Sequence, residues 1–303
     1  MGNAHRGAWR VRVFALGACA GVLAACGLFG GSPDRVTIGA VTFAENQIVA
    51  EIYAQVLEDA GRDVDRRFNF QRREDLYPEL ADGRVDLAPE YLASLLIFLE
   101  SDAVPSPDPD ESVDELEPLL SDAGLELLTP SEANDSNAFV VTGETAERYN
   151  LSAVSDLAAV AGELTFGGPP ECPDRRFCLA GLRDVYGVEF EAFQALDAGG
   201  PLTIAALSSG QIDVALMFST SAIIEERGWV VLEDDKNLQA AENITPLVRS
   251  EVVDEEIREL LDEVSALLTT ENMTKLNARV EMANEDVSAV AEDFLTIEGL
   301  LDE

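Results

Sequence analysis

Histidine is almost missing from this chain of 303 residues, in which the single example is His5. Imidazole is the most common general base near neutral pH and carries the proton in nucleophilic triads. We therefore expect no triad and no histidine-based catalysis, and we assign no catalytic residue. Carboxylate chemistry stays open, because Asp and Glu together number 58.

Lysine is nearly as scarce, and Lys236 and Lys275 are the two examples. Lys and Arg total 20 against 58 acidic residues, which gives a formal net charge of −38. A field of this sign repels nucleic acid and anionic lipid headgroups, so neither is an expected partner. The simplest consequence is a strongly hydrated surface. A saline habitat, where salt screens self-repulsion, is compatible with it.

The N-terminus has the features of a targeting segment. Three arginines precede an apolar run over residues 13–25, which is shorter than the ~20 residues that span a bilayer. The run ends in Leu-Ala-Ala before Cys26 and resembles a bacterial lipoprotein signal. We expect cleavage before Cys26 and lipid on its sulfur; an ordinary secretory signal is the alternative. Cleavage would leave 17 basic residues against 58 acidic ones, a net charge of −41.

Cysteine is rare as well, and two of the four cysteines, Cys19 and Cys26, belong to this N-terminal segment. Cys172 and Cys178 remain, in a chain that the signal directs to an oxidising compartment. This favours a disulfide between them over two free thiols. Two cysteines without a neighbouring histidine do not make a zinc site, so we expect no metal and no cofactor.

Two nine-residue stretches, 80–88 and 207–215, are near copies of each other. In each, a helix ends at a glycine suited to the left-handed conformation, and a short apolar strand follows. Each strand leads to an aromatic residue, Tyr91 or Phe218, at the end where ligands bind in open α/β sheets. The repeat predicts two similar lobes that send residues into a shared cleft around a small molecule.

The pattern of apolar residues predicts a βαβαβ unit over residues 36–88, which implies a parallel sheet. Thr42 and Glu45 are spaced like a capping box that opens its first helix. A second α/β unit follows the crossing segment 134–141, and residues 244–249 form a strand that returns to the first lobe.

We therefore expect an α/β fold with two lobes, in which lobe two is inserted into lobe one. The expected segments are a signal peptide (1–25), a tether (26–34), lobe one (35–137 and 238–303) and lobe two (138–237).

Several motifs together resemble one known family along nearly the whole chain. The longest are Ile-Gly-Ala-Val-Thr-Phe-Ala-Glu-Asn at 38–46, Gly-Arg-Val-Asp-Leu-Ala-Pro-Glu-Tyr at 83–91 and Val-Val-Leu-Glu-Asp-Asp-Lys at 230–236. The chain resembles the substrate-binding lipoproteins of osmoprotectant ABC importers, which bind glycine betaine, choline, carnitine and related solutes. The resemblance implies a type II periplasmic-binding-protein fold, an ABC permease with its ATPase subunit as partners, and an extracytoplasmic location on the membrane.

The resemblance also implies a ligand site, because a quaternary ammonium is bound by aromatic faces through cation–π attraction. Tyr91 and Phe218 match cage aromatics, Ser94 matches a hydroxyl donor, and Arg175 falls where a carboxylate-binding arginine is common. The full expected set is Thr42, Phe43, Tyr91, Ser94, Asn137, Arg175, Phe218, Ser219 and Thr220.

Two departures from the family pattern leave alternatives open. Asn137 stands where tyrosine is common, and Ala240 lies in a segment without the expected aromatic residue. The ligand is then a solute other than glycine betaine itself, within the same importer class. A two-lobed enzyme acting on a choline-like substrate is the alternative from another class, and a sensor without a transporter is a third. The sequence names neither the solute nor the permease.

Overall fold

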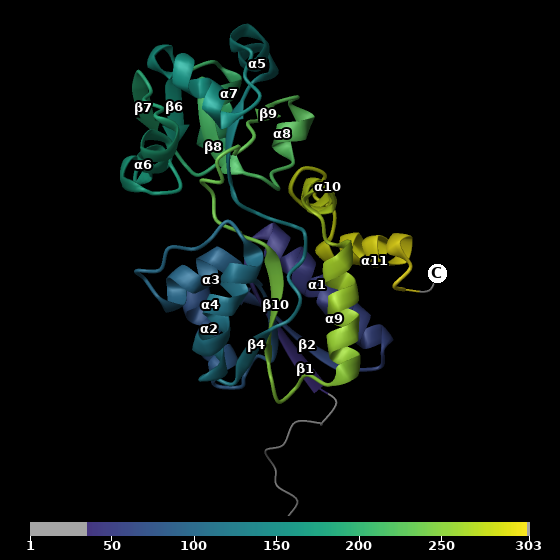
Figure 1. Cartoon of the computed structure of the whole chain (residues 1–303). Helices are drawn as coiled ribbons and strands as arrows, with labels where there is room; N and C mark the ends of the chain where they lie inside the picture. Colours follow the sequence, from purple (N-terminus) through teal and green to yellow (C-terminus); the bar gives the residue numbers. More distant parts are fainter. Residues whose placement is uncertain (1–34, 302–303) are drawn as a thin grey trace, which may run out of the picture. The chain divides into compact units, whose positions relative to one another are not determined.

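The computed structural model describes residues 35–301, so the expected signal peptide, Cys26 and the tether lie outside the described residues. Two five-stranded sheets form the framework, with strand orders β2-β1-β3-β10-β4 and β7-β6-β8-β5-β9 (Figure 1). We call each sheet with its helices a lobe. This arrangement confirms the expected α/β fold with two lobes.

Lobe one contains both ends of the described chain. Its strands are β1 (Arg35–Val41), β2 (Asp63–Phe70), β3 (Leu87–Tyr91), β4 (Leu125–Leu127) and β10 (Ile244–Arg249). Its helices are α1 (Ala44–Asp59), α2 (Arg73–Ala81), α3 (Leu92–Leu99), α4 (Pro109–Ser121), α9 (Glu255–Leu267), α10 (Thr270–Glu281) and α11 (Val287–Glu298).

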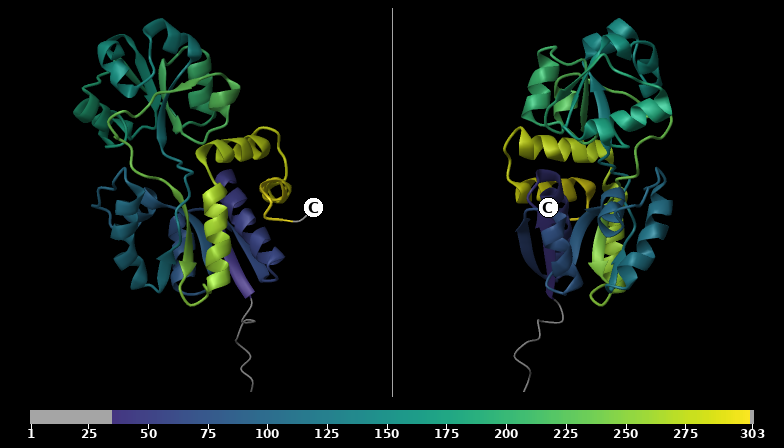
Figure 2. Two further views of the ribbon diagram at one scale, coloured as in Figure 1. Left: turned by 45° about the vertical axis from the view of Figure 1, so that its right-hand side comes forward. Right: turned by 90° about the vertical axis from the view of Figure 1, so that its left-hand side faces the viewer.

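Lobe two is built from the intervening residues. Its strands are β5 (Asn137–Val141), β6 (Thr165–Gly168), β7 (Ala192–Ala195), β8 (Val214–Phe218) and β9 (Val230–Val231). Its α-helices are α5 (Gly143–Tyr149), α6 (Leu179–Gly181), α7 (Pro201–Ser208) and α8 (Ile223–Glu226). The chain enters through β5 and leaves after β9, and a bridge between Asn134 and Asn243 joins the two crossing segments, which Figure 2 shows from two sides.

Helices cover both faces of each sheet, because neighbouring strand residues point to opposite sides. In β10, Val248 belongs to the apolar cluster that includes residues of α1, α9, α10 and α11, whereas its neighbour Leu247 belongs to the cluster that includes residues of α2, α3 and α4. In β5, Phe139 and Val140 divide in the same way between the two apolar clusters of lobe two. The result is a buried apolar layer on each side of each sheet.

The two near-identical stretches perform the same structural task in both lobes. Gly83 and Gly210 have φ of +72° and +70°, as the left-handed helix ends require. Three residues on, the carboxylates of Asp86 and Asp213 accept hydrogen bonds from the backbone N–H of the first parallel strand, at 2.8 Å each. Each repeat therefore fixes a central strand to its parallel neighbour.

Two local expectations were wrong. The strand expected at 85–88 begins at Leu87, because the backbone N–H of Val85 still donates to Glu79 at the end of α2. The capping box is not formed: α1 has Phe43 at its N-cap and no side-chain cap. The N–H of Thr42 donates to Phe70 instead, and the Glu45 carboxylate accepts from Tyr91.

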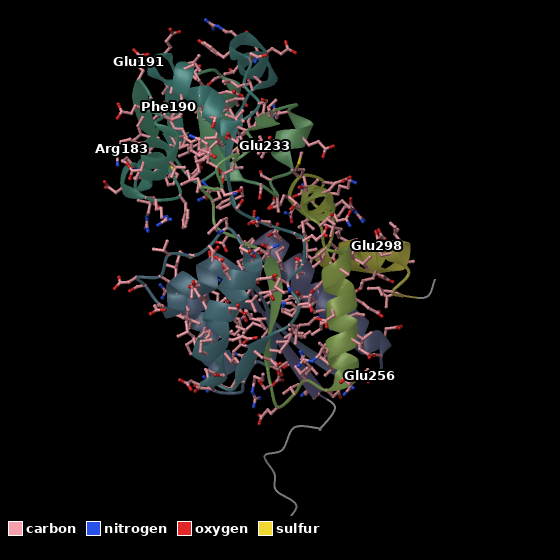
Figure 3. The ribbon with its side chains drawn as sticks, viewed as in Figure 1. Arg183, Phe190, Glu191, Glu233, Glu256 and Glu298 are labelled. Carbon is pink, nitrogen blue, oxygen red and sulfur yellow. A yellow bond between two sulfur atoms is a disulfide. The ribbon has the colours of Figure 1, made fainter. Side chains whose placement is uncertain are left out.

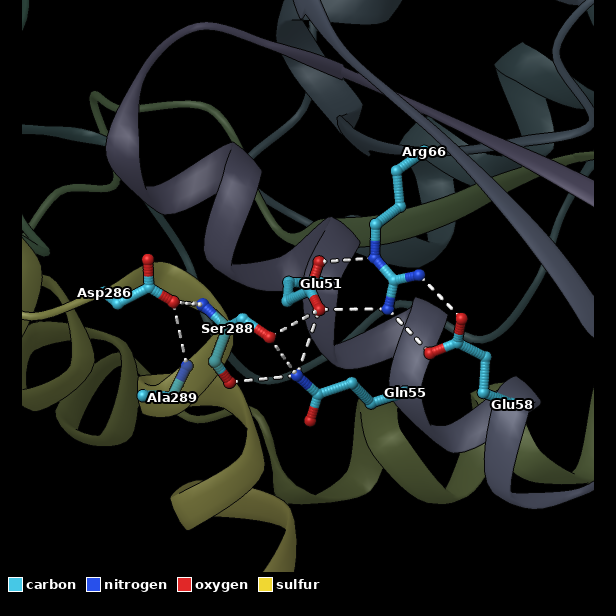
Figure 4. A network of polar contacts seen from close by, with 7 residues as sticks. All are labelled: Glu51, Gln55, Glu58, Arg66, Asp286, Ser288 and Ala289. Atoms are coloured by element: carbon cyan, nitrogen blue, oxygen red, sulfur yellow. Dashed lines mark hydrogen bonds and ion pairs between the residues drawn. The ribbon is translucent and has the colours of Figure 1, made fainter.

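A polar network attaches α11 to α1 and β2 (Figure 4). The carboxylate of Glu51, which is 4% exposed, accepts from two guanidinium nitrogens of Arg66 at 2.8 and 3.0 Å. Ser288, in the first turn of α11, donates its hydroxyl hydrogen to the same carboxylate at 3.1 Å, and Gln55 bridges the two helices.

None of the helices within residues 35–301 is both long and apolar enough to cross a membrane.

Candidate ligand-binding site

A cavity of about 900 Å³ is lined by residues of both lobes. Its wall includes the ends of β3 and β8, the starts of α1, α3 and α7, the two crossing segments and the end of α10. The carboxyl ends of parallel strands and the first turns of helices meet there, which is where ligands bind in open α/β folds. We take this cavity as the candidate site.

Aromatic side chains form one part of the wall. Tyr91, at the end of β3, is 8% exposed, and the centre of its ring lies 5.9 Å from that of Phe43, with the planes tilted by 33°. Phe43 and Phe218, which are 44% and 41% exposed, are available for contact with a solute. Phe177 lies in the wall as well. These rings offer the electron-rich faces that attract a cation.

The carboxyl group of Glu45 lies beside the Tyr91 ring. It accepts from the Tyr91 hydroxyl at 3.0 Å and from the Asn277 amide of α10 at 2.8 Å. Burial and, to a smaller extent, the nearby Asp135 carboxylate raise its pKa, hydrogen bonds from its neighbours lower it in part, and the net result is a pKa of about 7. Glu45 is therefore a buried carboxyl group that a bound cation would help to ionise.

Asp135 and Glu242 come from the two crossing segments. Asp135 accepts from the Thr220 hydroxyl at 2.6 Å, and burial raises its pKa. Glu242 accepts from the backbone N–H and the hydroxyl of Ser94 at 3.0 and 2.7 Å. Burial raises the pKa of Glu242 to about 7 against the lowering effect of those hydrogen bonds. Glu281, at the end of α10, adds a fourth carboxyl group to the wall.

The structure brings together six of the nine residues expected at the ligand site. Those in the wall of this cavity are Phe43, Tyr91, Ser94, Asn137, Phe218 and Thr220.

Thr42, Ser219 and Arg175 lie elsewhere. Thr42 lines a smaller cavity of about 300 Å³ that shares Phe43 and Tyr91 with the large one. The Ser219 hydroxyl donates to the backbone carbonyl of Asn134, so it belongs to a crossing segment. Arg175 lines an adjoining cavity of about 400 Å³. Its part in binding stays a prediction.

The disulfide between Cys172 and Cys178 is present, which confirms that expectation, and its Cα atoms are 5.3 Å apart. Both cysteines are buried in the apolar core of lobe two. The loop that they close, residues 173–177, holds Arg175 in the wall of the adjoining cavity and Phe177 in the walls of both cavities, which also share Ile97 and Asn137. Within residues 35–301 no group of His, Cys, Asp or Glu side chains could hold a metal ion.

Sequence reasoning missed the carboxylates and the amide of Asn277. Glu45 stood inside a quoted motif but was assigned to a helix cap, and Asp135 and Glu242 lie beside the predicted crossing strands. Their position in those segments, where chain from both lobes converges, is the signal that could have found them. Asn277 offered no such signal, because it approaches Glu45 from a helix 232 residues further along the chain.

Two α/β lobes around a cavity walled by aromatic rings and carboxylates define the class of two-lobed solute-binding proteins. Residues 34–296 match the family described as the substrate binding domain of ABC-type glycine betaine transport system. The chain belongs to this family, which makes it the substrate-binding component of an ABC transport system.

Individual relatives agree with this assignment. The chain is 31% identical to a glycine-betaine-binding protein of Pseudomonas aeruginosa over 94% of both chains. It is 28% identical to the carnitine transport binding protein OpuCC of Listeria monocytogenes, over 89% of this chain and 88% of that one. A crystal structure described as a glycine betaine/carnitine/choline ABC transporter has the same fold, with a TM-score of 0.81 and 24% identity over 88% of this chain and 100% of that one.

Proposed function

We propose that this protein is the extracytoplasmic receptor of an ABC importer for quaternary ammonium solutes and delivers them to the membrane permease and its ATPase subunit. The observation that supports this most is the grouping of Tyr91, Phe43 and Phe218 with buried carboxylates around one cavity. A quaternary ammonium has no N–H to donate, so aromatic faces and nearby negative charge are the groups that bind it. A desolvated cation–π contact contributes about 2 kcal/mol or more.

The incomplete aromatic wall of the cavity favours a solute other than glycine betaine within this class. Asn137 and Ala240, which stand where aromatic residues were expected, both lie in the wall. The wall therefore lacks two of the ring faces that the family pattern provides. We propose a different quaternary ammonium solute of this class as the ligand.

Calorimetric titration of the purified protein with glycine betaine, choline, carnitine and ergothioneine tests the proposal. At least one of these solutes should bind, and glycine betaine should bind weakly or not at all. Mass spectrometry of any ligand that co-purifies with the protein would identify a solute outside this panel. A protein that binds none of the four, and that carries a ligand without a quaternary ammonium, would refute the function.

We also propose that lipid on Cys26 attaches the protein to the membrane. The short apolar run and the Leu-Ala-Ala before Cys26 support this, since such a run cannot span a bilayer. Replacement of Cys26 by Ser should release the protein from the membrane fraction into the soluble extracytoplasmic fraction. Retention of Cys26→Ser at the wild-type level would contradict the anchor without affecting the binding function.

A further inference from the structure

We infer, on the basis of the proposed function, that Glu45, Asp135 and Glu242 make this site select a solute with a net positive charge over one that also carries a carboxylate. The ligand class is a quaternary ammonium alcohol, for which choline is the probe. Glycine betaine is the corresponding zwitterion, with the same trimethylammonium group and a carboxylate in place of the hydroxymethyl group.

The charges in the wall are strongly unbalanced. Four carboxyl groups line the cavity, from Glu45, Asp135, Glu242 and Glu281. Among the described residues, Arg73 is the one basic side chain in the wall, and it is ion-paired with Glu90 at 2.8 Å. A solute carboxylate would therefore enter a region of negative potential, where like charges repel strongly because little water screens them.

Most of the side-chain hydrogen-bond donors in the wall already donate to protein acceptors. Seven polar side chains already donate to protein acceptors, namely Arg73, Tyr91, Ser94, Asn137, Thr220, Gln239 and Asn277. Four of these bonds, from Tyr91, Ser94, Thr220 and Asn277, end on the carboxylates themselves. A solute carboxylate would have to displace such a bond or turn to the hydroxyls of Ser136 and Ser221, whereas a trimethylammonium group needs no donor.

The N-terminus of helix α7, which could bind an anion, already has a protein carboxylate as its hydrogen-bond acceptor. Helix α7 begins at the cavity with Pro201, and its first N–H groups point out of its N-terminus. The Asp197 carboxylate accepts from Leu202 N–H at 3.0 Å and from Thr203 N–H at 2.9 Å. The chain thus satisfies these donors internally.

A buried acceptor without a partner lies in the same wall. Asn277 is 3% exposed, and its Oδ1 has no hydrogen-bond partner among the described residues. An unsatisfied buried oxygen is destabilising, and a donor on the solute that reached this atom would remove that cost. A solute hydroxyl is such a donor, whereas glycine betaine has none. This observation is independent of charge and favours the same solute class.

Arg175 is the group that a carboxylate-bearing solute would need. It lies in the adjoining cavity, with Asn137 and Phe177 between the two spaces. Arg175 is absent from the wall that holds Glu45 and Tyr91, so a zwitterion bound there lacks this partner for its carboxylate. The arrangement therefore disfavours glycine betaine.

Calorimetric titration with choline and glycine betaine tests this inference. Choline should bind at least about tenfold more tightly than glycine betaine. The substitutions Glu45→Gln and Glu242→Gln should each weaken choline binding about fivefold or more, because a neutral amide replaces a charge beside the cation. Neither should weaken binding of glycine betaine. Glu259→Gln makes the same charge change on the exposed surface of α9 and should leave both affinities unchanged.

Glu45 also holds Tyr91 and Asn277, so Glu45→Gln could fail to fold, and Glu242→Gln then carries the test. Glycine betaine binding as tightly as choline, or choline binding that is unaffected in the folded glutamine variants, would overturn the inference and leave the receptor function standing. Absence of binding by choline, glycine betaine, carnitine and ergothioneine, together with a co-purified ligand that lacks a quaternary ammonium, would instead refute the proposed function on which it rests.

Discussion

Glu45 illustrates, at the scale of single residues, how a carboxyl group acquires an unusual pKa. It is 2% exposed and accepts two hydrogen bonds from neutral donors, Tyr91 and Asn277, with no basic side chain bonded to it. Burial penalises its charged form, and the Asp135 carboxylate adds repulsion, so its pKa rises to about 7. Glu242 reaches a similar pKa although the charge of Arg73 lowers it in part.

These two pKa values predict how affinity for a cation depends on pH. A bound cation stabilises the carboxylate, so the pKa of Glu45 and of Glu242 should be lower in the complex than in the free protein. Binding then releases protons, and affinity is greatest above pH 7 and falls as pH decreases toward 5. Over this pH range the affinity falls about tenfold for each unit by which binding lowers the pKa of one carboxyl group.

Titration at pH 5.5 and pH 8, in two buffers with different ionisation enthalpies, measures both the affinity and the protons released. Glu45→Gln should flatten the pH dependence, and Glu259→Gln should leave it intact. An affinity that rises as pH falls, or binding without proton release, would contradict this role of the carboxylates.

The aromatic residues of the site could be predicted from sequence, whereas the burial and the raised pKa of the carboxyl groups could not. Tyr91 and Phe218 end two near-identical strand motifs, so local pattern alone places them at equivalent positions in the two lobes. Glu45, Asp135 and Glu242 derive their properties from burial and from partners such as Asn277 and Ser94, which are 232 and 148 residues away. No local pattern encodes such distant contacts.

At the scale of secondary-structure elements, one guanidinium group organises the polar part of the contact between α11 and α1, beside its apolar part. Arg66 donates to both oxygens of the nearly buried Glu51 and to both oxygens of Glu58 (Figure 4). Glu51 in turn accepts from Ser288 of α11. Loss of Arg66 would leave a buried carboxylate without its charged partner, which is costly because water cannot replace it.

Arg66→Ala should lower the free energy of unfolding by about 2–3 kcal/mol. Arg35→Ala is the matched control, because Arg35 pairs with Asp63 where the two side chains are 50% and 61% exposed. An exposed pair of this kind contributes less than about 1 kcal/mol. Urea unfolding followed by circular dichroism measures both variants. Equal losses in the two would show that the buried network adds nothing beyond a surface ion pair.

Most elements of both lobes could be predicted, because apolar periodicity and glycine positions are local signals. Residues 244–249 form β10 as expected. The start of β3 and the cap of α1 could not be predicted, since tertiary contacts decided them. Val85 donates to α2, and Glu45 turns toward the cavity instead of capping its own helix.

The whole molecule is dominated by negative charge. Twelve of the 17 basic residues in the described part of the chain form ion pairs, which neutralise only a fraction of the acidic side chains. Exposed glutamates such as Glu191, Glu256 and Glu298 project outward from both lobes (Figure 3). Repulsion among such side chains destabilises the compact state.

The melting temperature should therefore rise with sodium chloride concentration. Screening weakens both attraction and repulsion between exposed charges, and repulsion is the larger sum in a chain with 58 acidic and 20 basic residues. A thermal-unfolding series from low to molar salt, with sucrose as a non-ionic control, checks this. A flat or falling melting temperature would mean that the ion pairs already compensate the repulsion.

The lobes and the insertion of one into the other followed from the repeated motif and the returning strand, whereas the cavity and its charge required the structure.

The central claim is that this cavity binds a quaternary ammonium against Tyr91. Calorimetric titration of Tyr91→Ala with the solute that wild type binds best tests it most directly. Tyr77→Ala is the control, because Tyr77 packs on Phe98 outside the cavity. Loss of one cation–π face predicts affinity that is roughly tenfold weaker or more in Tyr91→Ala and unchanged in Tyr77→Ala. Wild-type affinity in Tyr91→Ala would contradict the account.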